Sequence, residues 1–140
     1  MTDSVRQPDL YAYYDIYSSK VEYSRTEQTE SKVQNIVLYT SPKLTQSIGS
    51  IVFDIKAFIS NPPIASRVLN IIVAFPFGTL SGQRTNQLKI VDVKPPLGPD
   101  SFVIYTILSG NNDFIGSKGY ITITSNETSI RRLDIWLDKQ

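Results

Sequence analysis

The segment "DLYAYYDIY", residues 9–17, carries the side chains with the clearest potential for chemistry. Side chains of a β-strand alternate between two faces, so Tyr11, Tyr13, Asp15 and Tyr17 would share one face. A carboxyl group withdrawn from water among phenols could act as a general acid or base, and the phenols could orient a ligand. The alternative interpretation is structural: Asp15 bonds to a neighbouring tyrosine or lies at a rim, and the tyrosines fill space.

Other candidate ligand-binding residues interrupt or end apolar runs. Asp54 breaks the run "IVFDIKAF", where the alternative is an outward pair of Asp54 and Lys56 on a solvent face. In "FPFGTL", Phe75 and Phe77 are candidates for the mouth of a cavity, with core packing as the alternative. Tyr105 lies in "SFVIYTIL" and is a further candidate.

Arg131 and Arg132 are consecutive, so they would point to opposite faces of a strand. One of them could enter a cavity and pair with Asp15, or both could serve at a rim or surface.

The composition removes several classes of chemistry. The chain has no His and no Cys, which most zinc enzymes and Ser or Cys hydrolases require. We therefore expect no metal site, no disulfide and no cofactor. The 140 residues carry a formal net charge of +1, so no field of one sign favours nucleic acid or anionic lipid as a partner. The chain has no apolar run long enough to span a bilayer, and we expect a cytoplasmic protein without membrane contact.

The elements that would position these side chains are strands. Short runs rich in β-branched and aromatic residues lie between Pro, Gly, Asn and Ser clusters, which predicts a single all-β domain over residues 1–140. The expected strands cover residues 9–17, 34–40, 50–59, 67–75, 79–84 with 86–93, 101–108, 119–125 and 130–138. Residues 18–33 have too few apolar side chains to define a buried face, so they are expected to form a mobile loop. Both faces of 101–108 and of 67–75 are apolar, which favours strands covered on both sides.

The loop "GNNDFIGSKG", residues 110–119, has three glycines. Glycine permits a left-handed or closely packed backbone, and the loop is expected to turn back at Gly116 after tucking Phe114 and Ile115 inward. Asn and Asp tolerate positive φ, so the polar residues at 111–113 can complete the turn.

Three stretches carry a family resemblance. "NIVLYTSPKLTQSIGSIVFDI", "LNIIVAFPFGTLSGQR" and "YTILSGNNDFIGSKGYITIT" resemble, in order and spacing, hairpins of the allene oxide cyclase and dirigent-like barrels. The resemblance implies a closed antiparallel eight-stranded β-barrel, whose interior is filled by side chains or holds one small ligand. An unrelated β-sandwich with a glycine-rich loop is the alternative.

The same resemblance suggests catalytic positions. It places Asp15 where the cyclases have a cavity Glu and Tyr17 where they have a cavity Asn, so these two are the candidate catalytic residues. Asn35 lies one place from the second cavity Asn, and Ile36 occupies the matching position. The carboxylate is kept but shortened and the amides are lost, which argues against a reaction on an allene oxide.

Two functions from different classes follow. The first is a barrel that binds one small apolar molecule and directs its cyclisation or isomerisation by shape. The second is a non-enzymatic structural or interaction subunit, because an apolar outer wall marks an interface. Both are compatible with a homo-oligomer, either a dimer or a trimer.

Overall fold

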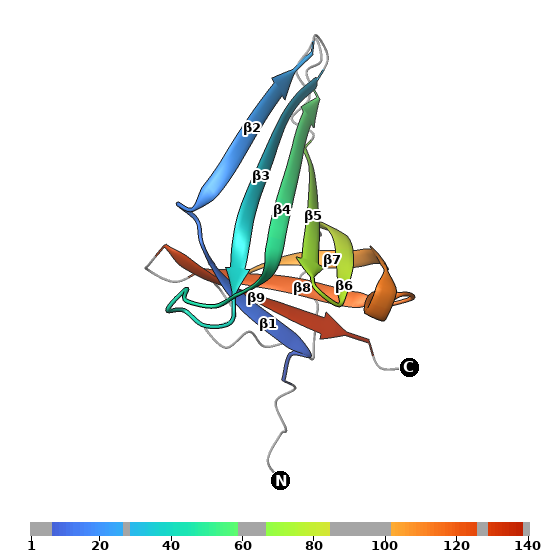
Figure 1. Ribbon diagram of the computed structural model, residues 1–140. Helices are drawn as coiled ribbons and strands as arrows, with labels where there is room; N and C mark the ends of the chain where they lie inside the picture. Colours follow the sequence, from blue (N-terminus) through green and yellow to red (C-terminus); the bar gives the residue numbers. More distant parts are fainter. Residues whose placement is uncertain (1–6, 27–28, 59–66, 85–101, 126–128, 139–140) are drawn as a thin grey trace.

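The described residues form strands almost throughout. The computed structural model describes residues 7–26, 29–58, 67–84, 102–125 and 129–138 (Figure 1). Within these ranges the chain has one short 3-10 helix and no α-helix. The strands are β1 (Leu10–Asp15), β2 (Ser19–Arg25), β3 (Thr29–Tyr39), β4 (Ser47–Phe58), β5 (Arg67–Phe75), β6 (Gly78–Arg84), β7 (Phe102–Gly110), β8 (Gly119–Ser125) and β9 (Ile130–Leu137), and the helix η1 (Asn112–Phe114) follows β7. The expected strand over 86–93 lies outside the described residues.

Eight of these strands close into a barrel. Every neighbouring pair is antiparallel, and the sheet runs β1-β9-β8-β7-β6-β5-β4-β3. The ring closes where β1 meets β3, with Tyr13 opposite Tyr39. In Figure 1 strands β3 to β5 stand steeply across β7, β8, β9 and β1, as expected for a strongly tilted small barrel. The predicted closed eight-stranded antiparallel barrel is confirmed.

Strand β2 is a ninth strand outside this ring. It pairs along most of β3, from Ser19 opposite Ile36 to Arg25 opposite Glu30. The prediction of a mobile loop over residues 18–33 is therefore wrong. Its side chains are exposed from Lys20 to Arg25, so backbone pairing rather than apolar burial holds the strand. A search for a buried face cannot detect such a strand.

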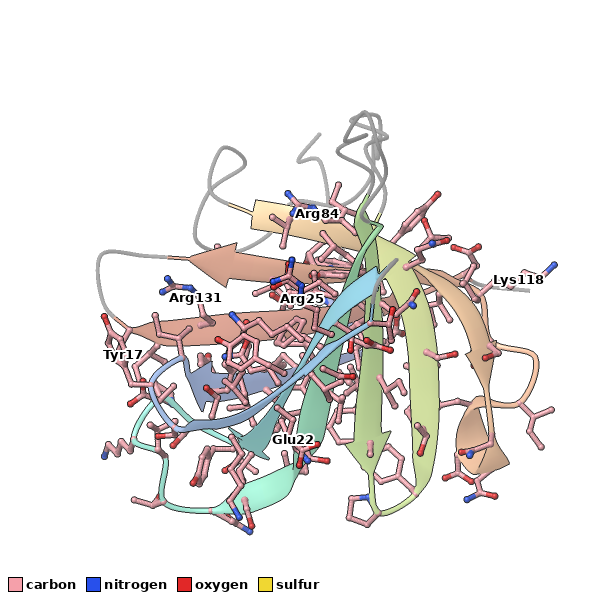
Figure 2. The ribbon with its side chains drawn as sticks, turned by 90° about the horizontal axis from the view of Figure 1, so that it is seen from above. Tyr17, Glu22, Arg25, Arg84, Lys118 and Arg131 are labelled. Atoms are coloured by element: carbon pink, nitrogen blue, oxygen red, sulfur yellow. The ribbon has the colours of Figure 1, made fainter. Side chains whose placement is uncertain are left out.

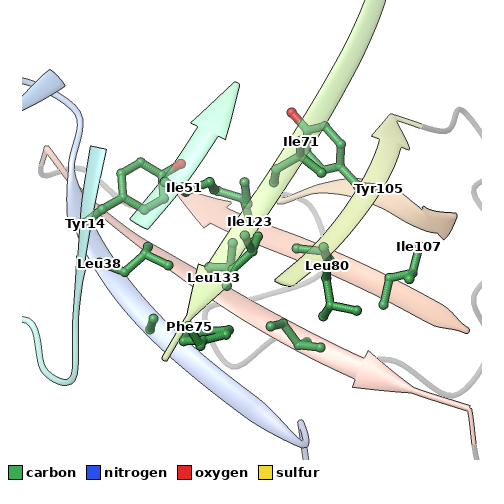
Figure 3. Close-up of a cluster of buried hydrophobic side chains, with 14 of the residues drawn as sticks. Tyr14, Leu38, Ile51, Ile71, Phe75, Leu80, Tyr105, Ile107, Ile123 and Leu133 are labelled. Carbon is green, nitrogen blue, oxygen red and sulfur yellow. The ribbon is translucent and has the colours of Figure 1, made fainter. Parts of the chain in front are cut away.

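The interior is filled by alternate residues of the eight ring strands. Figure 3 shows these side chains meeting between the two layers of strands. The buried members are Ala12, Tyr14, Ile36, Leu38, Ile51, Ile71, Val73, Phe75, Leu80, Tyr105, Ile107, Ile121, Ile123, Leu133 and Ile135, and Phe114 of η1 packs with them.

Some strands are also covered outside the barrel. Ile104 on β7 and Trp136 on β9 are buried on the face opposite the core. The expected two-sided cover holds at Ile104 of β7 but not at Leu108, which is 63% exposed on the same face, and it is wrong for β5, where Ile72 is 41% exposed. Because the outer face of β9 is already buried within one chain, it is not a free interface.

One end of the interior is closed by three phenylalanines. Phe75 and Phe77 stack with ring centroids 5.2 Å apart, and Phe114 of η1 lies 6.3 and 5.7 Å from them. A side chain at Gly110 would collide with Phe114, so the glycine lets η1 fold back over this end. We call Phe75, Phe77 and Phe114 the phenylalanine plug.

The loop after the plug turns as the sequence indicates, with one exception. Asn112 has φ of 50° and Gly116 has φ of 76°, both in the left-handed region. Phe114 is buried as expected, but Ile115 is 76% exposed, so its expected inward position is wrong. Two consecutive residues in a tight turn cannot both face the core. The larger side chain, Phe114, occupies the core position, and Ile115 points into solvent.

Candidate ligand-binding end of the barrel

The tyrosines predicted on the inner face of the first strand lie on its outer face. Ala12 and Tyr14 are buried in the core, whereas Tyr11 is 50% exposed and Tyr13 is half-buried. The predicted inward placement of Tyr11 and Tyr13 is therefore wrong. Both faces of this strand carry tyrosine, so the residue types alone do not show which face points into the barrel. Closure of the barrel decided it, because Ala12 pairs with the inward Leu133.

Asp15 and Tyr17 are at a turn and not in the interior. The Tyr17 backbone N–H donates to the Asp15 carboxylate Oδ1 over 2.9 Å, and the Ser18 N–H donates to the Asp15 carbonyl over 3.1 Å. Tyr17 is 82% exposed. Asp15 thus stabilises the turn that separates β1 from β2, as Asp commonly does. The expected position of this acid beside a cavity is wrong.

The outward tyrosines belong to a cluster with a partly buried ion pair. Arg132 donates through Nε to Asp134 Oδ1 over 2.9 Å and through a terminal nitrogen to the Tyr13 hydroxyl over 3.1 Å. Its guanidinium also lies 4.3 Å from the ring centroid of Tyr11. Burial raises the pKa of Asp134, and the charge and hydrogen bond of Arg132 oppose that rise. Because the neighbours of Tyr11 and Tyr13 are an arginine and an acid on the outer wall, these tyrosines do not meet the interior.

The remaining predicted residues are separated from one another. Asn35 is exposed, and Asp54 lies on the face of β4 opposite the inward Ile51, with a buried Oδ1 that has no hydrogen-bond partner. Phe75 and Phe77 belong to the plug. Tyr105 is buried in the core, as is Phe75, and it is the predicted polar residue that points into the barrel.

The end of the interior remote from the plug is aromatic. Phe53 lies between the other two rings, with centroid distances of 6.1 Å to Tyr14 and 6.4 Å to Tyr105. Figure 3 shows the Tyr14 and Tyr105 rings at the same end of the core cluster, with the Tyr14 hydroxyl directed toward Ile51. Phe53, Leu69 and Val103 pack against the core here but are half-buried, so solvent reaches this end. We call it the tyrosine end.

Each of the two tyrosines has an arginine directly opposite on the neighbouring strand. Tyr14 pairs with Arg131 across β1 and β9, and Tyr105 pairs with Arg84 across β6 and β7. Directly opposite residues project from the same face, so both arginines start on the inner face at the rim. Figure 2 shows both guanidinium groups from above the barrel.

The phenols at this end keep their protons. Burial raises the pKa of Tyr14 far above its ordinary value, the nearby Tyr105 raises it further, and Arg131 opposes the rise. Burial also raises the pKa of Tyr105, against the charge of Arg84. At neutral pH both hydroxyls are therefore hydrogen-bond donors, next to two cations. This combination suits a molecule with an apolar body and an anionic or accepting oxygen.

Sequence reasoning missed Tyr14 and Arg84 and left the direction of Arg131 open. The available signal was the pair Arg131 and Arg132, which must point to opposite faces. The structure resolves it, with Arg131 on the inner face and Arg132 on the outer wall. Arg131 faces Tyr14 and not Asp15.

A surface groove lies near the end of the barrel that the phenylalanine plug closes. It has a volume of about 180 Å³ and lies outside the barrel interior, between the turn at 115–118 and the end of β9, where it is lined by Ile115, Gly116, Ser117, Lys118, Leu137 and Asp138.

In the described residues no three Asp or Glu side chains gather as metal ligands. The described part of the chain also holds no helix of the length and apolar character needed to cross a membrane.

Comparison with known proteins supports the fold. No protein-family model matches the chain, and no curated protein matches it in sequence. Among solved structures it is similar to a pyocyanin demethylase, with a TM-score of 0.57 and 10% sequence identity over 92% of this chain and 100% of that one. At this identity the likeness shows the barrel fold alone. The narrower resemblance to allene oxide cyclase and dirigent-like barrels stays a prediction.

Proposed function

We propose that this barrel binds one small, largely apolar molecule at the tyrosine end, with an anionic or hydrogen-bond-accepting oxygen directed at Tyr14 and Tyr105. The observation that carries the proposal is that two buried tyrosines, on either side of the Phe53 ring, each have an arginine directly opposite on the neighbouring strand: Tyr14 has Arg131 and Tyr105 has Arg84.

The surroundings favour an apolar body with one polar group. Leu69 and Val103 are half-buried beside the three rings, so a ligand that covers them removes apolar surface from water. The tyrosine hydroxyls and the two arginines supply polar groups at this end of the barrel. Few polar groups around a mainly apolar site fix orientation, which is the usual composition of a small-molecule site.

The reaction class that fits these groups is a cofactor-independent cyclisation or isomerisation. Two protonated phenols can donate hydrogen bonds to an oxygen on which negative charge develops, and the aromatic walls can hold a reactive conformer. Asp15 has no part in this proposal, because it belongs to the turn before β2. The structural neighbour is a pyocyanin demethylase, so pyocyanin is a reasonable probe for this chain.

Titration with 8-anilinonaphthalene-1-sulfonate, an apolar aromatic anion with fluorescence that rises on binding, tests the site. We expect saturable binding to the full chain, weakened about three- to tenfold by Arg84→Gln and by Tyr105→Phe, because each removes one interaction with the anionic group. Lys118→Gln is the matched control: it removes an exposed cation from the surface groove. Binding reduced by Lys118→Gln but unchanged in the other two variants places the probe in the groove and refutes the proposal.

Circular dichroism shows whether each variant is folded, so that a loss of probe binding is read only from folded chains. Competition by pyocyanin in the same assay extends the test to a second aromatic molecule.

A second candidate function, an interaction subunit, is favoured by a separate feature. Strand β2 exposes Tyr17, Val21 and Tyr23 on or beside it, at 82%, 36% and 73%. A surface of this kind fits a protein partner.

A further inference from the structure

Strand β2 has an open edge. It is the last strand of the sheet, and within the described residues no strand pairs with its other side. Figure 1 shows β2 beside β3 and apart from the crossing strands of the barrel. The free N–H and C=O groups of such an edge can pair with a further strand.

The edge carries charged side chains but no Pro and no bulge. Proteins commonly block open edges with charges, Pro or bulges, and β2 is a regular seven-residue strand, SKVEYSR, in unbroken register with β3, so only the placement of its charges limits pairing. Its exposed side chains include the apolar Val21 and the aromatic Tyr23. One lysine and one glutamate flank Val21 symmetrically.

We infer that β2 pairs antiparallel with β2 of a second copy of this chain, with Val21 opposite Val21 on a two-fold axis. In this register Lys20 of each copy lies opposite Glu22 of the other, so two opposite-charge pairs form. Ser19 then lies opposite Tyr23. The contact is the same patch on both copies, as a two-fold dimer requires.

The charges select this register. A two-fold axis perpendicular to the sheet maps each face onto itself, so the axis must pass through a residue and cannot lie between two. Moving the axis to Lys20 or to Glu22 places like charges directly opposite, which is unfavourable. Moving it to Tyr23 leaves Glu22 opposite Ser24 without an ion pair. Among these four positions, the axis at Val21 alone pairs opposite charges.

The size of the contact sets the affinity. One seven-residue edge buries less than a standard protein interface, so we expect a dimer that forms and dissociates with concentration. The inference does not depend on the proposed ligand, because both side chains that determine the register lie on β2.

Sedimentation of the full chain at low ionic strength, from about 1 to 300 μM, tests the inference with charge exchanges. Lys20→Glu alone and Glu22→Lys alone each create two like-charged pairs, and each should weaken dimerisation about tenfold or more. The double variant Lys20→Glu/Glu22→Lys restores the opposite pairs and should dimerise like the wild type. An equal mixture of the two single variants should form a heterodimer, because every pair in it is opposite in charge.

Both positions are exposed and lie opposite the uncharged Asn35 and Val33 of β3, and within the described residues neither exchange breaks an ion pair. Restoration in the double variant and in the mixture therefore cannot come from changes in folding. A wild-type chain that stays monomeric throughout, a trimer, or a dimer that the single variants leave unchanged would overturn the inference.

Discussion

Replacing Phe114 by alanine removes the centre of the phenylalanine plug. The ring is 3% exposed and contacts both Phe75 and Phe77. Truncation of a buried phenylalanine removes its transfer free energy and leaves a cavity, which together cost about 3–5 kcal/mol. Native domains have only about 5–15 kcal/mol of stability, so this loss is a large fraction of the total. The melting temperature should fall by roughly 10–15 °C at a few degrees per kcal/mol.

Urea unfolding followed by the fluorescence of Trp136 measures this loss, because Trp136 is the only tryptophan and is fully buried. The matched control is Ile115→Ala, one residue further along, where the side chain is 76% exposed. That variant should stay within about 0.5 kcal/mol of the wild type. Similar losses in both variants, or a loss below about 1 kcal/mol for Phe114→Ala, would refute the assignment of Phe114 as the plug.

Two further predictions concern titration. Tyr14 and Tyr105 should stay protonated above pH about 10, because burial raises their pKa. Their contribution to stability is present below pH about 10 and is lost as the pH rises further. The absorbance of tyrosinate from these two residues should therefore appear only when the protein unfolds. The double variant Tyr14→Phe/Tyr105→Phe should lack this late increase in absorbance. Late ionisation that persists in the double variant would contradict this assignment. The raised pKa of the Asp134 carboxyl means that the folded state favours its protonated form, so the stability of the wild type relative to Asp134→Asn should fall as the pH rises from about 4 to 7. Urea unfolding across that range checks the sign, and a relative stability that rises with pH would show that the Arg132 ion pair dominates instead.

The barrel could be predicted from sequence because its determinants are local. Short apolar strands, proline-rich connections and the glycines of 110–119 each restrict the backbone on their own. Strand β2 could not be found in this way, because its stability comes from pairing with β3 while its side chains remain in water.

The site was harder to predict because it depends on pairing between distant strands. A tyrosine-rich segment indicates a strand, but either of its faces can be the inner one. Pairing with β9 places Tyr14 inside and Tyr11 and Tyr13 outside. Arg84 and Arg131 become neighbours of the two inward tyrosines only through cross-strand register, which a single sequence does not contain.

Native mass spectrometry of the chain purified gently from its own host tests the central claim most directly. The account predicts that wild-type chains carry one additional small mass, that Ile115→Ala retains it, and that Tyr14→Phe/Tyr105→Phe loses it. Wild-type chains that consistently show the bare mass, or an adduct retained by the double tyrosine variant, would contradict a ligand site at the tyrosine end.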